Sequence, residues 1–221
     1  KKSASGNGKR KLKNEIQWLK NLPKKLSYKF PTVVEVQDDE EIISYEMPWY
    51  NMPSLRHKII TGEYTKKDAL IQINAVLDFM FNNFYANKKP KTTNNYILEK
   101  HIDRVGVRLI ELYENSEFFR PIIEAKKVII NGIEYKNIPE CLFKIISNDK
   151  LIESLEPESF VNIHGDLHFQ NILVSDTNNF DEFIIADPRG EVDGGDIFYD
   201  FGKLFHSVNA KYDLIHTDQY K

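Results

Sequence analysis

The spacing of hydrophobic residues changes along the chain and predicts different elements in turn. Leu12, Ile16 and Leu19 fall on one helical face, and Pro23 ends that helix. Apolar runs at 32–36 and 42–46 flank an acidic turn, which predicts a β-hairpin. The N-terminal segment is therefore expected to combine a helix with a small antiparallel sheet.

Longer helices are expected from residue 65 onward. Thr65 and Asp68 are spaced as a capping box, and the apolar residues that follow as far as Phe84 lie on two sides of the predicted helix. That pattern predicts a central, buried helix. Further helices are expected at 97–113 and 139–146, and Asn131-Gly132 suits the two-residue turn of a hairpin at 128–135.

The C-terminal third changes to short strands. An expected strand at 160–163 leads into a polar motif, and apolar runs at 172–174 and 183–185 flank a turn. Asn171 precedes the first run and Asp187 follows the second. Because pairing the two runs closes a hairpin, we expect Asn171 and Asp187 to lie close together.

Composition limits the classes of function. Hydrophobic residues make up 41% and aromatic residues 12% of the 221 positions, which favours a packed globule. A formal charge of −3 gives no general attraction to nucleic acid or to a membrane surface, and no apolar run approaches the roughly 20 residues of a transmembrane helix. The single cysteine, Cys141, suits a reducing cytoplasm. The oligomeric state stays open.

The polar motif offers the chemistry of phosphoryl transfer. Asp166 stands five residues before Asn171, and Asp187 follows after the hairpin. In such a site one carboxylate orients the attacking hydroxyl, and two further oxygen ligands hold a metal on the nucleotide phosphates. Asp166 is therefore the candidate catalytic base, and Asn171 and Asp187 are candidate Mg²⁺ ligands.

The histidines of the motif leave alternatives open. His164 could act as a base or ligand, or brace the loop structurally, and His168 could face substrate or fill the loop. His164, Asp166 and His168 alternate, as the ligands of a metallohydrolase would on a straight strand. Gly165 disfavours a regular strand, and His206 is the sole plausible distant addition.

The stretch His164-Gly-Asp-Leu-His-Phe-Gln-Asn171 resembles the catalytic loop of the aminoglycoside phosphotransferase and choline kinase family, which is related to the protein kinases. Asp187 matches the family's metal-binding aspartate, and the segment 195–204 resembles the family's next motif, in the same order. The resemblance implies ATP or another NTP as phosphate donor, Mg²⁺ as cofactor, and a small molecule with a hydroxyl group as acceptor.

The resemblance extends upstream to the nucleotide site. It implies Lys2 (or Lys1) as the lysine that grips the phosphates and Glu15 as its glutamate partner, with Glu46, Met47 and Pro48 in the adenine-binding hinge. The implied fold is α+β and two-lobed, like that of protein kinases. Residues 1–46 would form a partial nucleotide-binding lobe, 47–53 the hinge, and 54–221 a helical lobe.

Two departures from the family pattern matter. Asp187 is followed by Pro188-Arg189-Gly190 instead of an aromatic residue or glycine, and Arg189 could contact a phosphate or pair with Glu191 or Asp193. The variant resembles bacterial members linked to surface-polysaccharide or sugar-nucleotide pathways. The family's glycine-rich loop would precede Lys1. A complete chain would therefore lack part of the nucleotide site, whereas a fragment raises no conflict.

The predicted activity is ATP- and Mg²⁺-dependent phosphorylation of a sugar, a sugar-like alcohol or an amino alcohol. The alternatives are a non-catalytic nucleotide-binding pseudokinase module and the His/Asp metallohydrolase. A protein kinase is a further alternative, disfavoured by the large helical insert before the catalytic loop and by the lack of an evident activation segment after Asp187.

Overall fold

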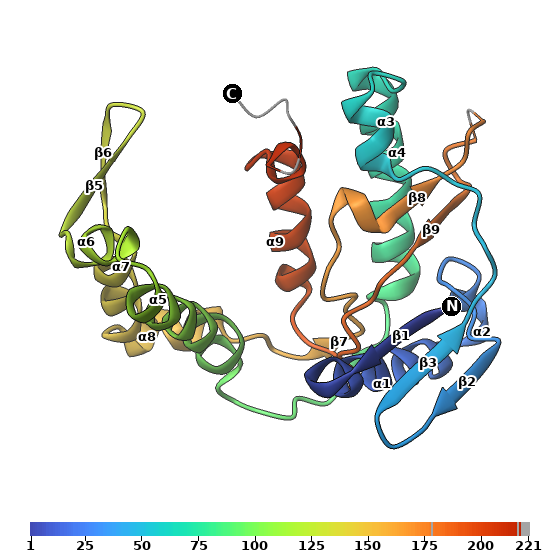
Figure 1. The fold of residues 1–221 in the computed structure, drawn as a ribbon, viewed down its shortest axis with the longest axis horizontal. Coiled ribbons are helices and arrows are strands. Elements are labelled where there is room, and N and C mark those ends of the chain that lie inside the picture. The colour runs from blue at the N-terminus through green and yellow to red at the C-terminus, as the bar shows by residue number, and fades with distance from the viewer. Residues whose placement is uncertain (178, 216, 218–221) are drawn as a thin grey trace. The chain divides into compact units, whose positions relative to one another are not determined.

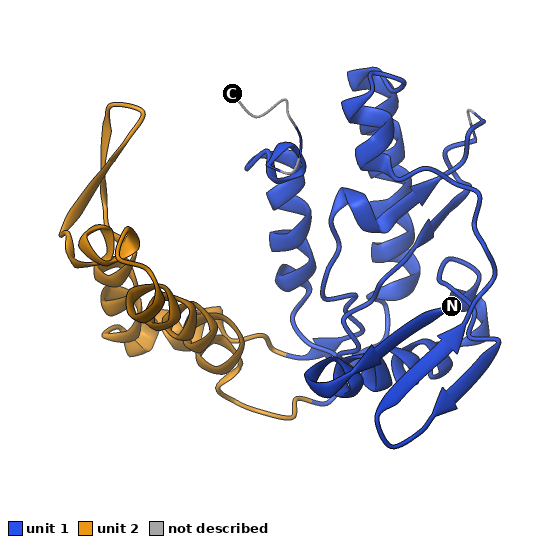
Figure 2. Cartoon of the chain, in the orientation of Figure 1, with its two compact units in different colours: residues 1–90, 159–221 blue, residues 91–158 orange. Residues whose placement is uncertain are grey.

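The computed structural model describes residues 1–177, 179–215 and 217, and shows a mixed α+β protein with small sheets (Figure 1). The predicted α+β class is confirmed. The chain divides into two compact units (Figure 2). Unit 1 comprises residues 1–90 and 159–221, and unit 2 comprises residues 91–158. Across the described residues, no helix is long and apolar enough to cross a membrane.

Unit 1 contains both ends of the chain. Its elements are β1 (Lys2–Ser5), α1 (Gly6–Lys20), α2 (Lys24–Ser27), β2 (Glu35–Asp38), β3 (Ile42–Glu46), α3 (Leu55–Ile60), α4 (Lys66–Phe79), the π-helix η1 (Met80–Phe84), β4 (Lys88–Lys89), β7 (Phe160–Val161), the 3₁₀ helix η3 (Phe169–Asn171), β8 (Ile172–Val174), β9 (Phe183–Ile185), α9 (Ile197–Val208) and the 3₁₀ helix η4 (Tyr212–Leu214).

The N-terminal sheet is antiparallel, with strand order β1-β3-β2, and α1 packs against β1 and β3 (Figure 1). Leu12, Ile16 and Leu19 are buried on one side of α1, as their helical spacing predicts. They join the strand residues Ile43 and Tyr45 in the hydrophobic core. The sheet and α1 therefore form two layers that share one hydrophobic core.

The predicted hairpin is present as β2 and β3, but its first strand lies at 35–38 instead of 32–36. The turn is shorter than the acidic run, because Asp39 Oδ1 accepts the backbone N–H groups of Glu41 and Ile42. Asp38 therefore belongs to the strand and pairs with Ile43. Its carboxylate lies 3.0 Å from Lys9 Nζ.

The predicted capping box begins α4. Thr65 Oγ1 accepts the Asp68 N–H, and the Asp68 carboxylate accepts the Thr65 N–H at 3.0 Å. The expectation of a central, buried helix is wrong: Leu70 is 51% exposed, and Phe81, in the π-helix η1 that follows, is 48% exposed. One face is buried through Val76 and Phe79, and η1 continues the helix to Phe84.

Unit 2 is mainly helical. Its elements are the π-helix η2 (Ile97–Ile102), α5 (Asp103–Asn115), α6 (Phe119–Glu124), β5 (Lys127–Ile130), β6 (Ile133–Lys136), α7 (Ile138–Ile146) and α8 (Asp149–Leu155). The predicted helix at 97–113 is thus a π-helical turn followed by α5. The predicted hairpin is confirmed as β5–β6, and Asn131 and Gly132 both have positive φ, as a type I′ turn requires.

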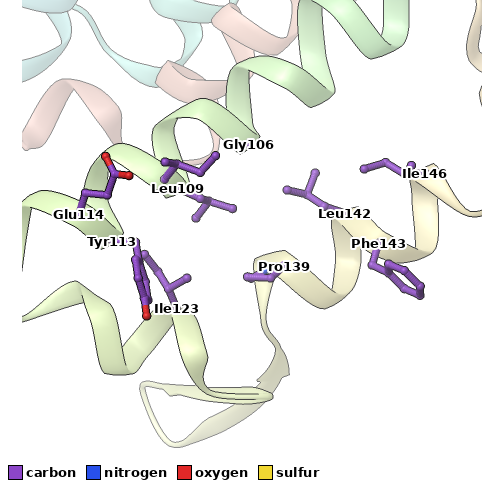
Figure 3. A pocket seen from close by; sticks show the side chains of 10 residues that line it. Gly106, Leu109, Tyr113, Glu114, Ile123, Pro139, Leu142, Phe143 and Ile146 are labelled. Atoms are coloured by element: carbon purple, nitrogen blue, oxygen red, sulfur yellow. The ribbon is translucent and has the colours of Figure 1, made fainter.

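Helices α5, α6 and α7 of unit 2 line an open apolar hollow of about 420 Å³ (Figure 3). Leu109 and Tyr113 of α5 line it together with Ile123 of α6 and Leu142 of α7. The Tyr113 hydroxyl donates a hydrogen bond of 2.8 Å to Glu124 Oε1. Unit 2 therefore has a concave surface of its own.

The C-terminal hairpin lies in the core of unit 1. Strands β8 and β9 pair in antiparallel register, with Ile172 opposite Ile185, and both of these side chains are fully buried. The expected strand at 160–163 is limited to β7, which pairs with β4. The chain that follows β7 leaves the sheet and forms the loop that carries the polar motif.

Candidate active site

The C-terminal hairpin connects the three polar residues predicted to act together. The backbone N–H of Ala186 donates to the backbone oxygen of Asn171 at 2.8 Å, and Asp187 is the next residue after Ala186. The buried Asn171 side chain donates from Nδ2 to the backbone oxygen of Asp166 at 3.0 Å. The hairpin therefore holds Asn171 beside both Asp166 and the start of the Asp187 segment.

Asp187 also contacts the N-terminal sheet. Lys2 Nζ forms an ion pair with Asp187 Oδ1, although the two residues are 185 positions apart. Asp187 has φ +63, a left-handed conformation that short polar side chains tolerate better than bulky ones. Its side chain is 56% exposed. The carboxylate thus stands at the surface, between the lysine of β1 and the C-terminal hairpin.

Lys2 forms a second pair, with both carboxylate oxygens of Glu15 in α1. Its Nζ lies 2.8 Å from Glu15 Oε1 and 2.7 Å from Oε2. Burial lowers the pKa of Lys2, but the hydrogen bonds to Asp187 and Glu15 outweigh it and raise that pKa above its ordinary value. The structure therefore places Lys2 with Glu15, as the resemblance implied for the phosphate-gripping pair.

Glu15 is held inside unit 1 by a second donor. The residue is 6% exposed, and the Tyr45 hydroxyl donates to its Oε1 at 2.8 Å. Burial raises the pKa of Glu15, and the Lys2 hydrogen bonds reduce that rise. Burial and the nearby Glu15 charge raise the pKa of Tyr45 far above its ordinary value. Tyr45 cannot be recognised as a site residue from the sequence, because its pairing with Glu15 depends on α1 packing against β3.

The predicted hinge residues lie at the end of β3. Glu46 is the last residue of that strand and accepts the Val34 N–H at 2.8 Å. Met47 is half-buried, with its Sδ 3.8 Å from the Tyr45 hydroxyl, whereas Pro48 is exposed. Tyr45 therefore connects Met47 to Glu15, but in the described part of the chain no hydrogen bond or ion pair joins Pro48 to the other predicted site residues.

Helix α9 anchors the backbone of the motif through Asp200. This fully buried carboxylate accepts the N–H of His164 at 2.8 Å, the N–H of Gly165 at 2.7 Å, and the Tyr85 hydroxyl at 3.0 Å. Burial raises its pKa to about 6. A carboxylate that accepts three hydrogen bonds satisfies donors that would otherwise be buried without partners, so Asp200 fixes the path of the loop.

His164 braces the loop structurally. It is fully buried, and its ring lies edge-on to Trp18. Nδ1 accepts the Asp166 N–H at 3.3 Å, so Nε2 carries the proton and donates to the Ala186 oxygen at 2.9 Å. Burial lowers its pKa to about 4. Both ring nitrogens are thus occupied by the main chain, which favours the structural interpretation over a metal ligand or a base.

The Asp166 carboxylate, 37% exposed, faces two basic side chains. Lys203 Nζ of α9 lies 2.9 Å from its Oδ1, and His168 Nε2 lies 3.5 Å from its Oδ2. Burial on its own would raise the pKa of Asp166, but the interactions with His168 and Lys203 outweigh it and hold that pKa well below the usual range. The carboxylate is therefore ionised at neutral pH.

Arg189 packs against the loop and pairs locally. Its Nε lies 3.3 Å from Glu191 Oε1, so of the proposed acidic partners Glu191 is the one found, and Nη1 lies 2.5 Å from the Tyr199 hydroxyl. Gly165 has φ +80, and a Cβ there would lie 2.7 Å from the Arg189 Cβ. The glycine of the motif is required both by its backbone conformation and by this close approach.

The donor set fits a hard cation. Asn171 uses Nδ2 within the loop, which leaves its side-chain oxygen for a ligand, and Asp187 presents a carboxylate at the surface. Amide and carboxylate oxygens are ligands that Mg²⁺ accepts together with nucleotide phosphates. Within the described ranges, no group of three or more His, Cys, Asp and Glu side chains is placed to hold a metal ion.

No known protein-family model matches the chain, and no curated protein matches it significantly. The function proposed below therefore rests on the geometry of Asp166, Asn171, Asp187 and Lys2, and on the sequence resemblance.

Proposed function

We propose that this protein is an ATP- and Mg²⁺-dependent phosphotransferase that phosphorylates a hydroxyl group of a small molecule. The observation that carries the proposal is the contact of Lys2 with both Glu15 and Asp187. It joins the residues implied for gripping phosphate to one implied for holding the metal, across nearly the whole sequence. The finer fold assignment, a kinase-like arrangement with residues 1–46 in the nucleotide-binding lobe, belongs to this proposal.

Each of these residues has a proposed role that follows from its position in the site. Lys2 offers a cation to the nucleotide phosphates, and Glu15 holds that cation in place. Asn171 and Asp187 would hold Mg²⁺, which when bound neutralises negative charge on the phosphates. The backbone oxygen of Asp166 accepts the Asn171 Nδ2–H, which keeps Asp166 next to this metal ligand, and its carboxylate would receive the acceptor hydroxyl.

The transfer itself is a displacement at phosphorus. The acceptor oxygen forms a bond to the γ-phosphorus while the bond from that phosphorus to the β–γ bridging oxygen breaks, and ADP leaves with the electron pair. The acceptor proton passes to the Asp166 carboxylate. Because the pKa of Asp166 is held low, this carboxylate is a weak base. Its contribution is to orient the hydroxyl and to accept the proton late in a loose transition state.

The test is phosphate transfer from γ-labelled ATP, with MgCl₂, to a panel of sugars, sugar alcohols and amino alcohols. We expect the 221-residue chain to label at least one acceptor. The Asp166→Ala variant should lose turnover while it keeps the thermal unfolding profile of the wild type. Turnover near the wild-type level in that variant would contradict the proposal.

The transfer assay, together with calorimetric ADP binding and metal analysis of the purified protein, separates the other functions. Mg²⁺-dependent ADP binding without transfer to any acceptor would favour a non-catalytic nucleotide-binding module. Labelling of generic protein substrates would favour a protein kinase. Tightly bound zinc or iron in the purified protein, without any response to ATP, would favour a metallohydrolase.

A further inference from the structure

Helix α9 reaches the catalytic loop at two successive points. Asp200 binds the backbone of His164 and Gly165, and Lys203 lies three residues later on the same helix. Residues three apart share a helical face. The Lys203 Nζ extends to Asp166 Oδ1 at 2.9 Å. One helix face therefore fixes both the backbone before Asp166 and the side chain of Asp166.

The two oxygens of Asp166 are held unequally. Oδ1 is within hydrogen-bond distance of Lys203 Nζ, whereas Oδ2 is 3.5 Å from His168 Nε2, beyond the usual range. The Lys203 side chain is only 20% exposed, so the packing of α9 limits its rotamers. Asp166 thus has one oxygen held at short distance by Lys203, and a second oxygen that has only the longer contact with His168 and can accept a hydroxyl.

We infer that Lys203 is a positioning residue, which holds Oδ1 of Asp166 so that Oδ2 receives the acceptor hydroxyl. The inference rests on the proposed phosphotransferase function and assigns a role that the sequence resemblance did not supply. Lys203 also supplies a positive charge beside a carboxylate that must approach the phosphates of the nucleotide. Without that cation, the carboxylate and the phosphates repel each other.

A residue that acts through Asp166 should affect turnover and leave nucleotide affinity nearly unchanged. It should also lose its effect when residue 166 can no longer take up the proton of the hydroxyl, as in Asp166→Asn. Those two properties distinguish positioning from a general contribution to folding.

The test compares Lys203→Met, Lys203→Arg, Asp166→Asn and the double variant Lys203→Met/Asp166→Asn in the full chain. The control is Lys66→Met, at an exposed lysine in the first turn of α4. The measurements are MgATP hydrolysis, in which water stands in for the alcohol, calorimetric binding of MgADP, and thermal unfolding. Hydrolysis reports kcat and KM separately.

We expect Lys203→Met to lower kcat about 10- to 100-fold, the effect of a displaced catalytic group, with the KM for MgATP and the MgADP affinity within about threefold of wild type. Lys203→Arg should recover most of the loss, because arginine keeps the charge near Oδ1. In the Asp166→Asn background, Lys203→Met should add less than about a further twofold loss.

Three outcomes would overturn the inference. An unchanged kcat in Lys203→Met would remove the positioning role but leave the phosphotransferase intact. Losses that multiply in the double variant would show that Lys203 acts independently of Asp166. If the wild-type chain neither binds MgADP nor turns over MgATP, the proposed function fails, and the role of Lys203 fails with it.

Discussion

Lys2 and Glu15 form a two-point ion pair, with the lysine nitrogen 2.8 and 2.7 Å from the two carboxylate oxygens. The pair joins β1 to α1 at the surface that also carries Asp187. The Glu15 side chain is 8% exposed and that of Lys2 33%. Water can therefore solvate the lysine charge in part, whereas the carboxylate charge is compensated mainly by its protein partners. Removing one partner leaves the other charge poorly compensated.

Lys2→Met should therefore destabilise the protein by roughly 2–3 kcal/mol, somewhat below the usual cost of breaking a fully buried pair, because Lys2 is partly exposed. Lys1→Met is the matched control, since the side chain of Lys1 is 48% exposed, and it should change stability by less than about 0.5 kcal/mol. Urea unfolding measures both. Equal effects at the two neighbouring lysines would show that Glu15 does not need Lys2.

Asp200→Ala should cost about 3 kcal/mol or more. It leaves the backbone donors of His164 and Gly165 and the Tyr85 hydroxyl buried without their acceptor. Asp200→Asn should cost less, because the amide oxygen can still accept. Asp78→Ala, at an exposed position of α4, should stay within about 0.5 kcal/mol. Urea unfolding would contradict this expectation if the Ala variants at 200 and 78 behaved alike.

The free energy of unfolding should depend on pH in a way that reflects the lowered pKa of His164. Burial lowers its folded pKa to about 4 from 6.5. Between pH 4 and 6.5 the unfolded chain binds a proton at His164 that the folded protein does not bind. The contribution of neutral His164 to the free energy of unfolding is therefore fully present above pH 6.5 and is lost as the pH falls towards 4. A shift of this size corresponds to roughly 3 kcal/mol.

Asp200 acts in the opposite direction, because burial raises its folded pKa from 3.8 to about 6. The contribution of Asp200 to the free energy of unfolding is present below pH 3.8 and lost as the pH rises through 6. In the wild type, the pH-dependent contributions of Asp200 and His164 therefore largely cancel. In His164→Gln the cancellation ends. The stability of the wild type minus that of the variant should grow by roughly 3 kcal/mol from pH 4 to 6.5. A constant difference across urea titrations at several pH values would refute the assignment.

Asp187→Asn should weaken the Mg²⁺ dependence of ADP binding. The variant keeps the shape of the side chain but removes the charge offered to the cation. We expect the gain in ADP affinity on adding Mg²⁺ to fall at least about tenfold, the lower range seen even for groups that only support metal ligands. Calorimetry with and without EDTA measures that gain, and ADP affinity without Mg²⁺ serves as the internal control. An undiminished gain would exclude Asp187 as a ligand.

The parts of the fold that the sequence predicts are those set by short-range chemistry. The Thr65–Asp68 capping box and the Asn131–Gly132 turn depend on a few adjacent residues, and both form as predicted. The neighbourhood of Asn171 and Asp187 follows from the pairing of two adjacent strands. By contrast, the exposure of Leu70 in α4 and of Phe81 in η1 depends on what packs against these two helices, which helical spacing does not reveal.

In the candidate site, too, the residues that the sequence predicts are those close together in a motif or joined by a hairpin. The spacing of Asp166, Asn171 and Asp187, and their resemblance to a known family, indicate these three residues. Lys203 was not assigned a role, because its contact with Asp166 depends on where α9 meets the loop. The Tyr85–Asp200 hydrogen bond joins residues 115 positions apart and could not be foreseen. The helical spacing of Asp200 and Lys203 was the one available signal, and it has meaning only once Asp200 is known to bind the loop.

The pairing of β4 with β7 has a consequence for how such a protein can diversify. Lys88–Lys89 lie beside Phe160–Val161, so the chain leaves unit 1 and returns to it at neighbouring points. Residues 91–158 are thus inserted between two paired strands, and β7 ends three residues before His164. A short turn that joins β4 directly to β7 should therefore leave the backbone of the polar motif in place, so that residues 91–158 can change in sequence or length without disturbing it.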